Sequence, residues 1–217
     1  MENPVTVNIE SLLITLNDRV YKPAEDTFLL LDTIKYLIKY GRLDIECKDI
    51  LDLGTGVGLI ALWVALKAPT SPKRVVATDI SPKAIRCAKQ NTTINQTENV
   101  VVICSHLFSA FSKDTKFDII LFNPPYVPSK TDQFKKPKNW EEIAWNGGAQ
   151  GREIIDQFLQ SFSNYLTDTG VALILHSSLN YPEKSSKIAK SQGFHMEIIS
   201  KKRLPWEILM VLALTRG

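Results

Sequence analysis

The tetrapeptide Asn123-Pro124-Pro125-Tyr126 has the residue types needed to orient a planar nitrogen for methylation. It follows the apolar run 117–122, which predicts a buried strand that must stop at the two prolines. Asn123 is then expected at the strand's carboxyl end, where open α/β sheets bind ligands. A planar amide or amino nitrogen is a poor nucleophile with two N–H donors. The Asn123 side chain and the Pro124 carbonyl can accept from both donors while Tyr126 stacks on the flat group, which is catalysis by orientation. An ordinary Asn-Pro loop is the alternative.

A glycine-rich turn, Gly54-Thr55-Gly56-Val57-Gly58, joins a predicted strand to a predicted helix. Glycines there let the backbone approach a ligand closely. A dinucleotide fingerprint requires glycine at position 59, which is leucine, so NAD is disfavoured. The acid Asp52 beside the turn would oppose a phosphate and suit the ammonium end of S-adenosylmethionine. A tight turn with no ligand is the alternative.

A second acid, Asp79, ends the predicted strand 74–79. A carboxylate at this point can accept hydrogen bonds from both ribose hydroxyls of a nucleoside. Ser81 and Pro82 follow as the cap and first residue of the next helix, which supports the position of Asp79 at the strand tip. The succession of glycine turn, Asp79 and Asn123 therefore predicts a nucleoside cofactor beside an acceptor amide.

The elements that must position these residues alternate between short β-rich runs and helical stretches after residue 45, which indicates a parallel sheet covered on both faces. The predicted strands lie near 49–53, 74–79, 99–104, 117–122, 170–176, 193–199 and 207–214. The predicted helices lie near 25–40, 57–67, 81–94, 151–166 and 181–191. We expect residues 1–45 to form an N-terminal extension and helix packed on the core, and residues 46–217 to form the main α/β domain, which carries the site, as a single structural unit.

Composition limits the classes of protein that fit. Hydrophobic residues make up 44% of the 217 residues and charged residues 23%, without an apolar run that could span a membrane. The N-terminus lacks a secretion signal, and Cys47, Cys87 and Cys104 form no Cys-x-x-Cys pair. We therefore expect a globular cytoplasmic protein with no bound metal and no membrane partner. The net charge of +3 is small for a protein that binds nucleic acid by charge alone.

Together these motifs resemble the class I S-adenosylmethionine-dependent methyltransferases. Two further segments resemble the archaeal and eukaryotic branch of the HemK-like glutamine methyltransferases: Tyr-Lys-Pro-Ala-Glu-Asp-Thr-Phe-Leu-Leu-Leu-Asp at 21–32 and Gly-Gly-Ala-Gln-Gly-Arg at 147–152. The resemblance covers nearly the whole chain from Tyr21. It implies a Rossmann-like α/β fold whose seven-stranded, mostly parallel sheet has the order 3-2-1-4-5-7-6, with the last strand antiparallel and helices on both faces.

The resemblance also implies an activity, which is methylation of the Gly-Gly-Gln glutamine amide of a class I translation release factor. The residues it assigns to the cofactor S-adenosylmethionine are Thr27, Asp52, Gly54, Gly56, Asp79, Ile80, His106, Leu107 and Asn123. The residues assigned to the substrate are Asn123, Pro124, Pro125, Tyr126 and Arg152, and the catalytic residues among these are Asn123, Pro124 and Tyr126. His106 departs from the usual pattern, which has an acid that accepts from the adenine amino group; a neutral histidine can still accept through one ring nitrogen.

Charged residues stand at two predicted helix starts, and their positions can be explained by function or by helix electrostatics. Arg152 is expected near the positive end of a helix, where a cation is unfavourable, so it suggests an acidic partner in a loop or in the substrate, although Glu153 can also neutralise it. Glu25 and Asp26 are interpreted as acids that suit the first turn of a helix. His176 and His195 lie in apolar strand patterns and are given no chemistry.

A partner is expected on the strand 99–104, because the resemblance places it at the edge of the sheet and four consecutive β-branched residues on an open edge invite aggregation. The family supplies a small zinc-binding activator as the candidate, in a heterodimer.

Two other functions stay open. One is methylation of the adenine amino group in nucleic acid, which offers the same planar nitrogen; a protein lysine or a small molecule is also open as the acceptor. A basic stretch is usually a solvated face, but this one could equally contact RNA or the release factor; its residues are Lys130, Phe134, Lys135, Lys136, Lys138 and Trp140. The other is a non-catalytic binding subunit, suggested by His106.

Overall fold

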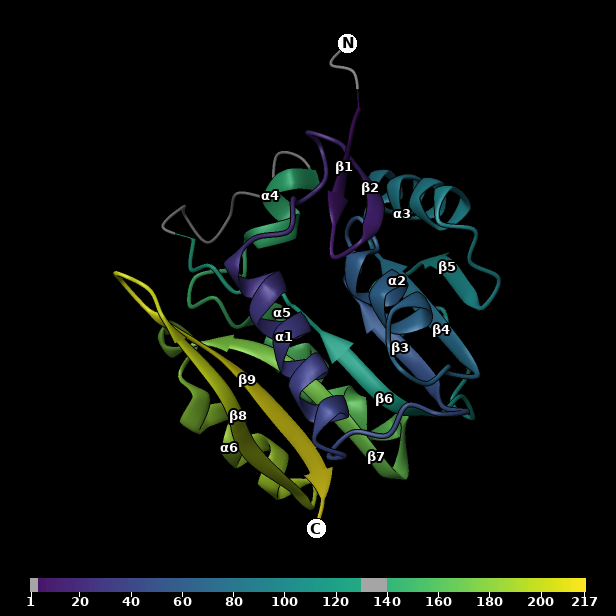
Figure 1. The fold of residues 1–217 in the computed structure, drawn as a ribbon. Coiled ribbons are helices and arrows are strands. Elements are labelled where there is room, and N and C mark those ends of the chain that lie inside the picture. Colours follow the sequence, from purple (N-terminus) through teal and green to yellow (C-terminus); the bar gives the residue numbers. More distant parts are fainter. Residues whose placement is uncertain (1–3, 130–139) are drawn as a thin grey trace.

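The computed structural model describes residues 4–129 and 140–217. At its centre is a seven-stranded sheet with the order β5-β4-β3-β6-β7-β9-β8 (Figure 1). The strands are β3 (Asp49–Leu53), β4 (Arg74–Asp79), β5 (Val100–Cys104), β6 (Phe117–Phe122), β7 (Leu166–Ser177), β8 (Phe194–Arg203) and β9 (Ile208–Arg216). Numbered within the sheet, this is the order 3-2-1-4-5-7-6. β9 runs antiparallel to both its neighbours, so the predicted topology is confirmed.

Helices cover both faces of this sheet, as predicted. One face carries α1 (Glu25–Lys39), α2 (Leu59–Leu66) and α3 (Pro82–Ile94), and the other carries α5 (Glu153–Ser161) and α6 (Pro182–Ser191). Neighbouring strand residues such as Ile50 and Leu51 belong to two different hydrophobic cores, because side chains alternate between the faces of a strand. The strands are therefore apolar on both sides, which fixes the sheet as the buried middle layer.

A β-hairpin that the sequence analysis did not predict precedes α1. It consists of β1 (Val5–Ile9) and β2 (Leu12–Leu16). Its two-residue turn places Glu10 and Ser11 at positive φ, where glycine or asparagine is the usual signal. Asn91 of α3 and Asn95, which caps the end of that helix, hold β2 through paired hydrogen bonds to the backbone of Thr15 and Leu13, with lengths of 2.7 to 3.2 Å.

Several boundaries differ from the predicted ones. The stretch 151–166, predicted as one helix, ends as α5 at Ser161 and continues as the short 3-10 helix η1 (Phe162–Asn164). β7 then begins at Leu166, so Gly170 lies within a strand and does not start one. The stretch 127–148, for which no helix or strand is predicted, contains α4 (Trp140–Trp145), and η2 (Ser178–Asn180) follows β7. The basic stretch from Lys130 to Lys138 lies outside the described residues.

In the part of the chain that the structure describes, no helix combines the length and the apolar character needed to cross a membrane. The same residues contain no cluster of side chains that could hold a metal ion.

Candidate active site

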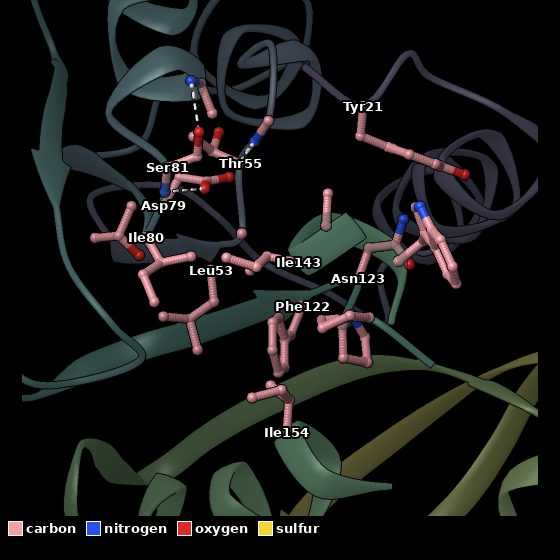
Figure 2. A pocket seen from close by; sticks show the side chains of 18 of the residues that line it. Tyr21, Leu53, Thr55, Asp79, Ile80, Ser81, Phe122, Asn123, Ile143 and Ile154 are labelled. Carbon is pink, nitrogen blue, oxygen red and sulfur yellow. Dashed lines mark hydrogen bonds between the residues drawn. The ribbon is translucent and has the colours of Figure 1, made fainter. Parts of the chain in front are cut away.

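A cavity of about 340 Å³ opens at the edge of the sheet where β3, β4 and β6 end. Figure 2 shows Asp79 and Ser81 on one side of it and Tyr21 and Asn123 on the other. The sequence-predicted residues that line it are Thr27, Asp52, Gly54, Gly56, Asp79, Ile80, His106, Leu107, Asn123, Pro124, Pro125 and Tyr126. Residues from the start of α1 thus meet residues at the ends of four strands, β3, β4, β5 and β6.

The glycine turn places the backbone against the acceptor tetrapeptide. Gly54 and Gly56 have φ values of +65° and +57°, which favour glycine. A Cβ atom on Gly54 would lie 3.5 Å from the Phe122 ring and 3.6 Å from the carbonyl oxygen of Asn123. These are ordinary contact distances, so the positive φ, and not a lack of space, is what favours glycine at position 54.

Asp79 is held in one orientation by the backbone around it. Its Oδ2 accepts a hydrogen bond from the Gly56 amide at 3.0 Å, and its Oδ1 accepts one from the Ser81 amide at 2.8 Å. Burial raises the pKa of this carboxyl above its ordinary value, against the effect of these amides. Each oxygen keeps a second acceptor site, which fits the two hydroxyls of a ribose.

Asp52 is buried below the same turn. The Thr55 hydroxyl donates to its Oδ2 at 2.6 Å. Burial raises the pKa of Asp52 to about 7, and the nearby charge of Asp79 adds to this, while the Thr55 hydrogen bond opposes it. A carboxylate with so little solvation favours a cationic ligand close by.

The charge of the lining fits S-adenosylmethionine better than a phosphate-bearing cofactor. Four acids (Asp26, Asp52, Asp79, Glu153) line the cavity, and Arg19 is the one lysine or arginine among the described lining residues. The sulfonium and ammonium groups of S-adenosylmethionine are cations, whereas the pyrophosphate of NAD would meet like charge. The residues present therefore fit the cofactor that the sequence predicted.

Asn123 has an unused acceptor at the centre of the site. Its Nδ2 makes a long contact of 3.5 Å with the Thr27 hydroxyl. Its Oδ1 is buried and has no hydrogen-bond partner within the described residues. Leaving a buried acceptor unsatisfied costs about 1–3 kcal/mol, so the site is arranged to receive an N–H donor at this atom.

Tyr21 and Asp26 are functional candidates that the sequence analysis missed. The Tyr21 hydroxyl donates to Asp26 Oδ2 at 2.8 Å, and Asp26 Oδ1 accepts from the amide and the hydroxyl of Thr27 at 2.6 and 3.2 Å. Asp26 does lie in the first turn of α1, as predicted, but it is buried and orients Thr27. Burial and the charge of Asp26 raise the pKa of Tyr21 and of Tyr126 above the usual tyrosine range, so both stay neutral.

The position of Tyr126 is fixed by Asn180, which follows β7. Asn180 Nδ2 donates to the carbonyl oxygens of Tyr126 at 2.7 Å and of Gly151 at 3.0 Å, and its Oδ1 accepts from the Ser177 amide at 3.1 Å. A Cβ atom on Gly151 would lie 2.1 Å from the Tyr126 carbonyl oxygen. The segments that contain Tyr126, Gly151 and Ser177 therefore meet at the buried side-chain amide of Asn180. A residue larger than glycine does not fit at position 151.

Arg152 does not lie against the cavity, in contrast to its predicted role in substrate binding. Its side chain is 2% exposed and pairs with Asp156, one turn further along α5, where Nε lies 3.1 Å from Oδ1. Its Nη1 also donates to the carbonyl oxygens of Asn180 and Tyr181. The positive charge of Arg152 at the start of α5 is thus neutralised by Asp156 within the chain. A buried guanidinium requires such a partner and a full set of hydrogen bonds. Arg152 supports Asn180 and not the substrate directly.

Comparisons with known proteins agree with this geometry. A family model described as the methyltransferase small domain matches residues 27–139. A Methanocaldococcus jannaschii protein, provisionally named a protein N5-glutamine methyltransferase, is 38% identical over 95% of this chain and 96% of its own. The release factor glutamine methyltransferase of Fusobacterium nucleatum is 32% identical over 86% of this chain and 51% of its own. The E. cuniculi Mtq2–Trm112 complex, described as responsible for methylation of the eRF1 translation termination factor, contains a chain with the same fold. Its TM-score is 0.66 at 24% identity, over 91% of this chain and 98% of that one.

Proposed function

The chain belongs to the methyltransferase small domain family, and from that membership we propose its function. It transfers a methyl group from S-adenosylmethionine to the side-chain amide nitrogen of a glutamine in a class I translation release factor. The names of the relatives from Methanocaldococcus jannaschii and Fusobacterium nucleatum support the glutamine and the release factor. The observation in this chain that carries the proposal is the buried, unpaired Oδ1 of Asn123 beside an acid-rich cavity.

The residues of the chain act by orientation. Asn123 Oδ1 and the Pro124 carbonyl accept the two N–H groups of the glutamine amide, and Tyr126 packs on its flat face. This holds the nitrogen lone pair toward the methyl group, which the cofactor supplies on a cationic sulfur. The N–C bond would form as the S–C bond breaks, which would leave the cofactor's sulfur as a neutral thioether, and the proton lost from the nitrogen would pass to solvent water. Positioning of this kind can supply several kcal/mol of the barrier.

The cofactor side is held by residues whose hydrogen bonds are already in place. Asp79 accepts from the ribose hydroxyls, Asp52 attracts the cationic methionine end, and Thr27 lies beside Asn123 at the meeting point of the two halves. His106 and Leu107 line the cavity where the adenine would lie. These residues bind the cofactor, whereas Asn123, Pro124 and Tyr126 orient the glutamine amide. The two roles can therefore be tested separately.

The experiment is methyl transfer from labelled S-adenosylmethionine to a cognate class I release factor, compared with the same factor whose Gly-Gly-Gln glutamine is replaced. Label that depends on this glutamine establishes substrate and reaction together. Label on neither factor, despite measurable cofactor binding, would contradict the proposal. Label on RNA or DNA would favour the alternative of adenine methylation.

We also propose that a small zinc-binding protein covers the outer strand of the sheet. β5 is an edge strand, and Val101 on it is 43% exposed, so its backbone offers a free row of hydrogen-bonding groups. The two-protein complex of E. cuniculi supports a partner. Val101→Lys should leave the cofactor cavity unchanged but prevent co-purification with the partner. Turnover and yield that do not depend on the partner would argue against it.

The division of the chain and its location follow from the same proposal. We propose that residues 1–45 form an extension packed on the methyltransferase domain of residues 46–217. The active site needs both parts, because Tyr21, Asp26 and Thr27 line the cavity. A substrate that acts in translation supports a cytoplasmic location.

A further inference from the structure

The hairpin formed by β8 and β9 ends at the same edge of the sheet as the cavity. β7 runs parallel to β6, and β9 runs antiparallel to β7, so the end of β6 and the start of β9 lie at one edge. The turn between β8 and β9 is closed by a 2.9 Å hydrogen bond from the Leu204 amide to the Glu207 carbonyl. Figure 1 shows this hairpin reaching past the other strands on that side.

Two contacts fix the hairpin beside the acceptor residues. Lys202 pairs with Glu25, the first residue of α1. The Ile208 amide donates to the Ser178 hydroxyl at 3.0 Å, two residues before the Asn180 that holds Tyr126. The charge of Glu207 also contributes to the raised pKa values of Tyr21 and Tyr126. The turn therefore lies next to the opening through which an acceptor amide must enter.

The surface at this turn is unusual for a free protein surface. Trp206 is 90% exposed, and Leu179 and Tyr181, which follow β7, are also exposed. Lys201 and Arg203 are exposed on β8, and neither has an ion-pair partner in the described part of the chain. We call these five residues the hairpin rim. Tryptophan and arginine are the residue types that most often carry the binding energy of protein interfaces.

We propose that the hairpin rim is the docking surface for the folded protein that carries the acceptor glutamine, an inference that rests on the proposed function. A glutamine side chain is short, so its backbone must lie at the mouth of the cavity when its amide reaches Asn123. The surface around that glutamine then covers the hairpin rim. Trp206 buries its ring against an apolar patch of the substrate, and Lys201 and Arg203 pair with acidic side chains beside that patch.

Trp206→Ala tests the apolar anchor, with Tyr40→Ala as the matched control. Tyr40 is a 60% exposed aromatic residue at the other end of α1. With the intact release factor, Trp206→Ala should raise KM by about tenfold and leave kcat and cofactor affinity near those of the wild type. With a short peptide that contains Gly-Gly-Gln, wild type and variant should be equal. Tyr40→Ala should match the wild type in both assays.

Lys201→Ala combined with Arg203→Ala tests the charges. The KM for the release factor should rise about threefold at low salt, and the difference should vanish at high salt. An unchanged KM in both rim variants would overturn the inference, as would an equal loss with the short peptide, because that loss would mean a distorted site. If these variants lost affinity for an RNA oligonucleotide but not for the release factor, the rim would belong to nucleic acid. A wild-type enzyme that labels no release factor would instead reject the proposed function itself, and the inference with it.

Discussion

The cofactor half of the cavity is held by hydrogen bonds between residues close in sequence, whereas the acceptor half is held by contacts across the chain. Asp52 and Thr55 are 3 residues apart, and Asp79 and Gly56 are 23 apart. In the acceptor half, Asn123 and Thr27 are 96 residues apart, and Tyr126 and Asn180 are 54 apart. The glycine turn, Asp52 and Asp79 of the cofactor half therefore come from one strand-helix-strand unit, while the acceptor half requires segments from α1 to the end of β7. Changes in the two halves should affect different measured quantities.

The largest effect is expected for Asn123→Ala. It removes the acceptor that orients the substrate amide, so turnover should fall by about a hundredfold to a thousandfold. Cofactor affinity, measured by calorimetry, should change little, because Asp52, Asp79 and the glycine turn are untouched. A variant that kept its turnover would show that the acceptor amide lies elsewhere.

Asp79→Asn should produce the opposite pattern. Loss of a charged acceptor for the ribose hydroxyls should weaken cofactor binding by about tenfold to a hundredfold. Turnover at saturating cofactor should stay close to that of the wild type. If turnover fell and affinity did not, the division into two halves would be wrong.

Asn180→Ala tests whether the acceptor half depends on its distant support. Loss of the buried amide leaves the Tyr126 and Gly151 carbonyls unpaired, which should cost about 1–3 kcal/mol of stability and let Tyr126 move. We expect kcat to fall by about tenfold with little change in cofactor affinity.

The matched control for this experiment is Asn95→Ala, which removes a comparable anchor of the N-terminal hairpin. It should lower the melting temperature without lowering kcat. Equal kcat values in both variants would mean that Asn180 serves stability alone.

The smallest expected effect is the pH dependence of cofactor affinity, which we assign to Asp52. Its pKa of about 7 in the free protein means that the attracting carboxylate forms as pH rises through this value. Cofactor affinity should therefore increase from pH 6 to pH 8 by about fivefold, and Asp52→Asn should remove this dependence. An increase that persists in Asp52→Asn would assign the titration to another group.

The same shift has a consequence for stability. The folded pKa of about 7 lies above the ordinary 3.8, so the folded state binds more protons between these values. The contribution of Asp52 to stability therefore decreases as pH rises through this window.

The spacing of the glycines, Asp52 and Asp79 belongs to a local unit, and these residues line one cavity as expected; their contact with a cofactor stays a prediction. The strand order came from the family resemblance and not from the spacing. The acceptor tetrapeptide 123–126 was also predicted from the sequence, but the hydrogen bond from Asn180 that holds Tyr126 was not. Asn180 lies in the sequence Ser-Leu-Asn-Tyr, which carries no periodic signal, and the ion pair of Arg152 with Asp156 forms only where the two side chains are buried together.

Asp26 was missed for a related reason. An acid in the first turn of a helix already has a sufficient local explanation, so its burial beside Tyr21 could not be inferred from its position. The spacing of Tyr21, five residues before Asp26, was the available signal.

The position of β9 has a consequence for how the protein is made. β9 lies between β7 and β8, so a growing chain cannot close the sheet before residues 208–216 have been synthesised. Until then β7 has an unpaired edge, which is a template for aggregation. Asp52, the glycine turn and Asp79 have all been synthesised by the start of α3, and domains can begin to fold during synthesis. A nascent chain would thus contain Asp52, the glycine turn and Asp79 long before Asn180, and methyl transfer would become possible only when the last strand has been inserted.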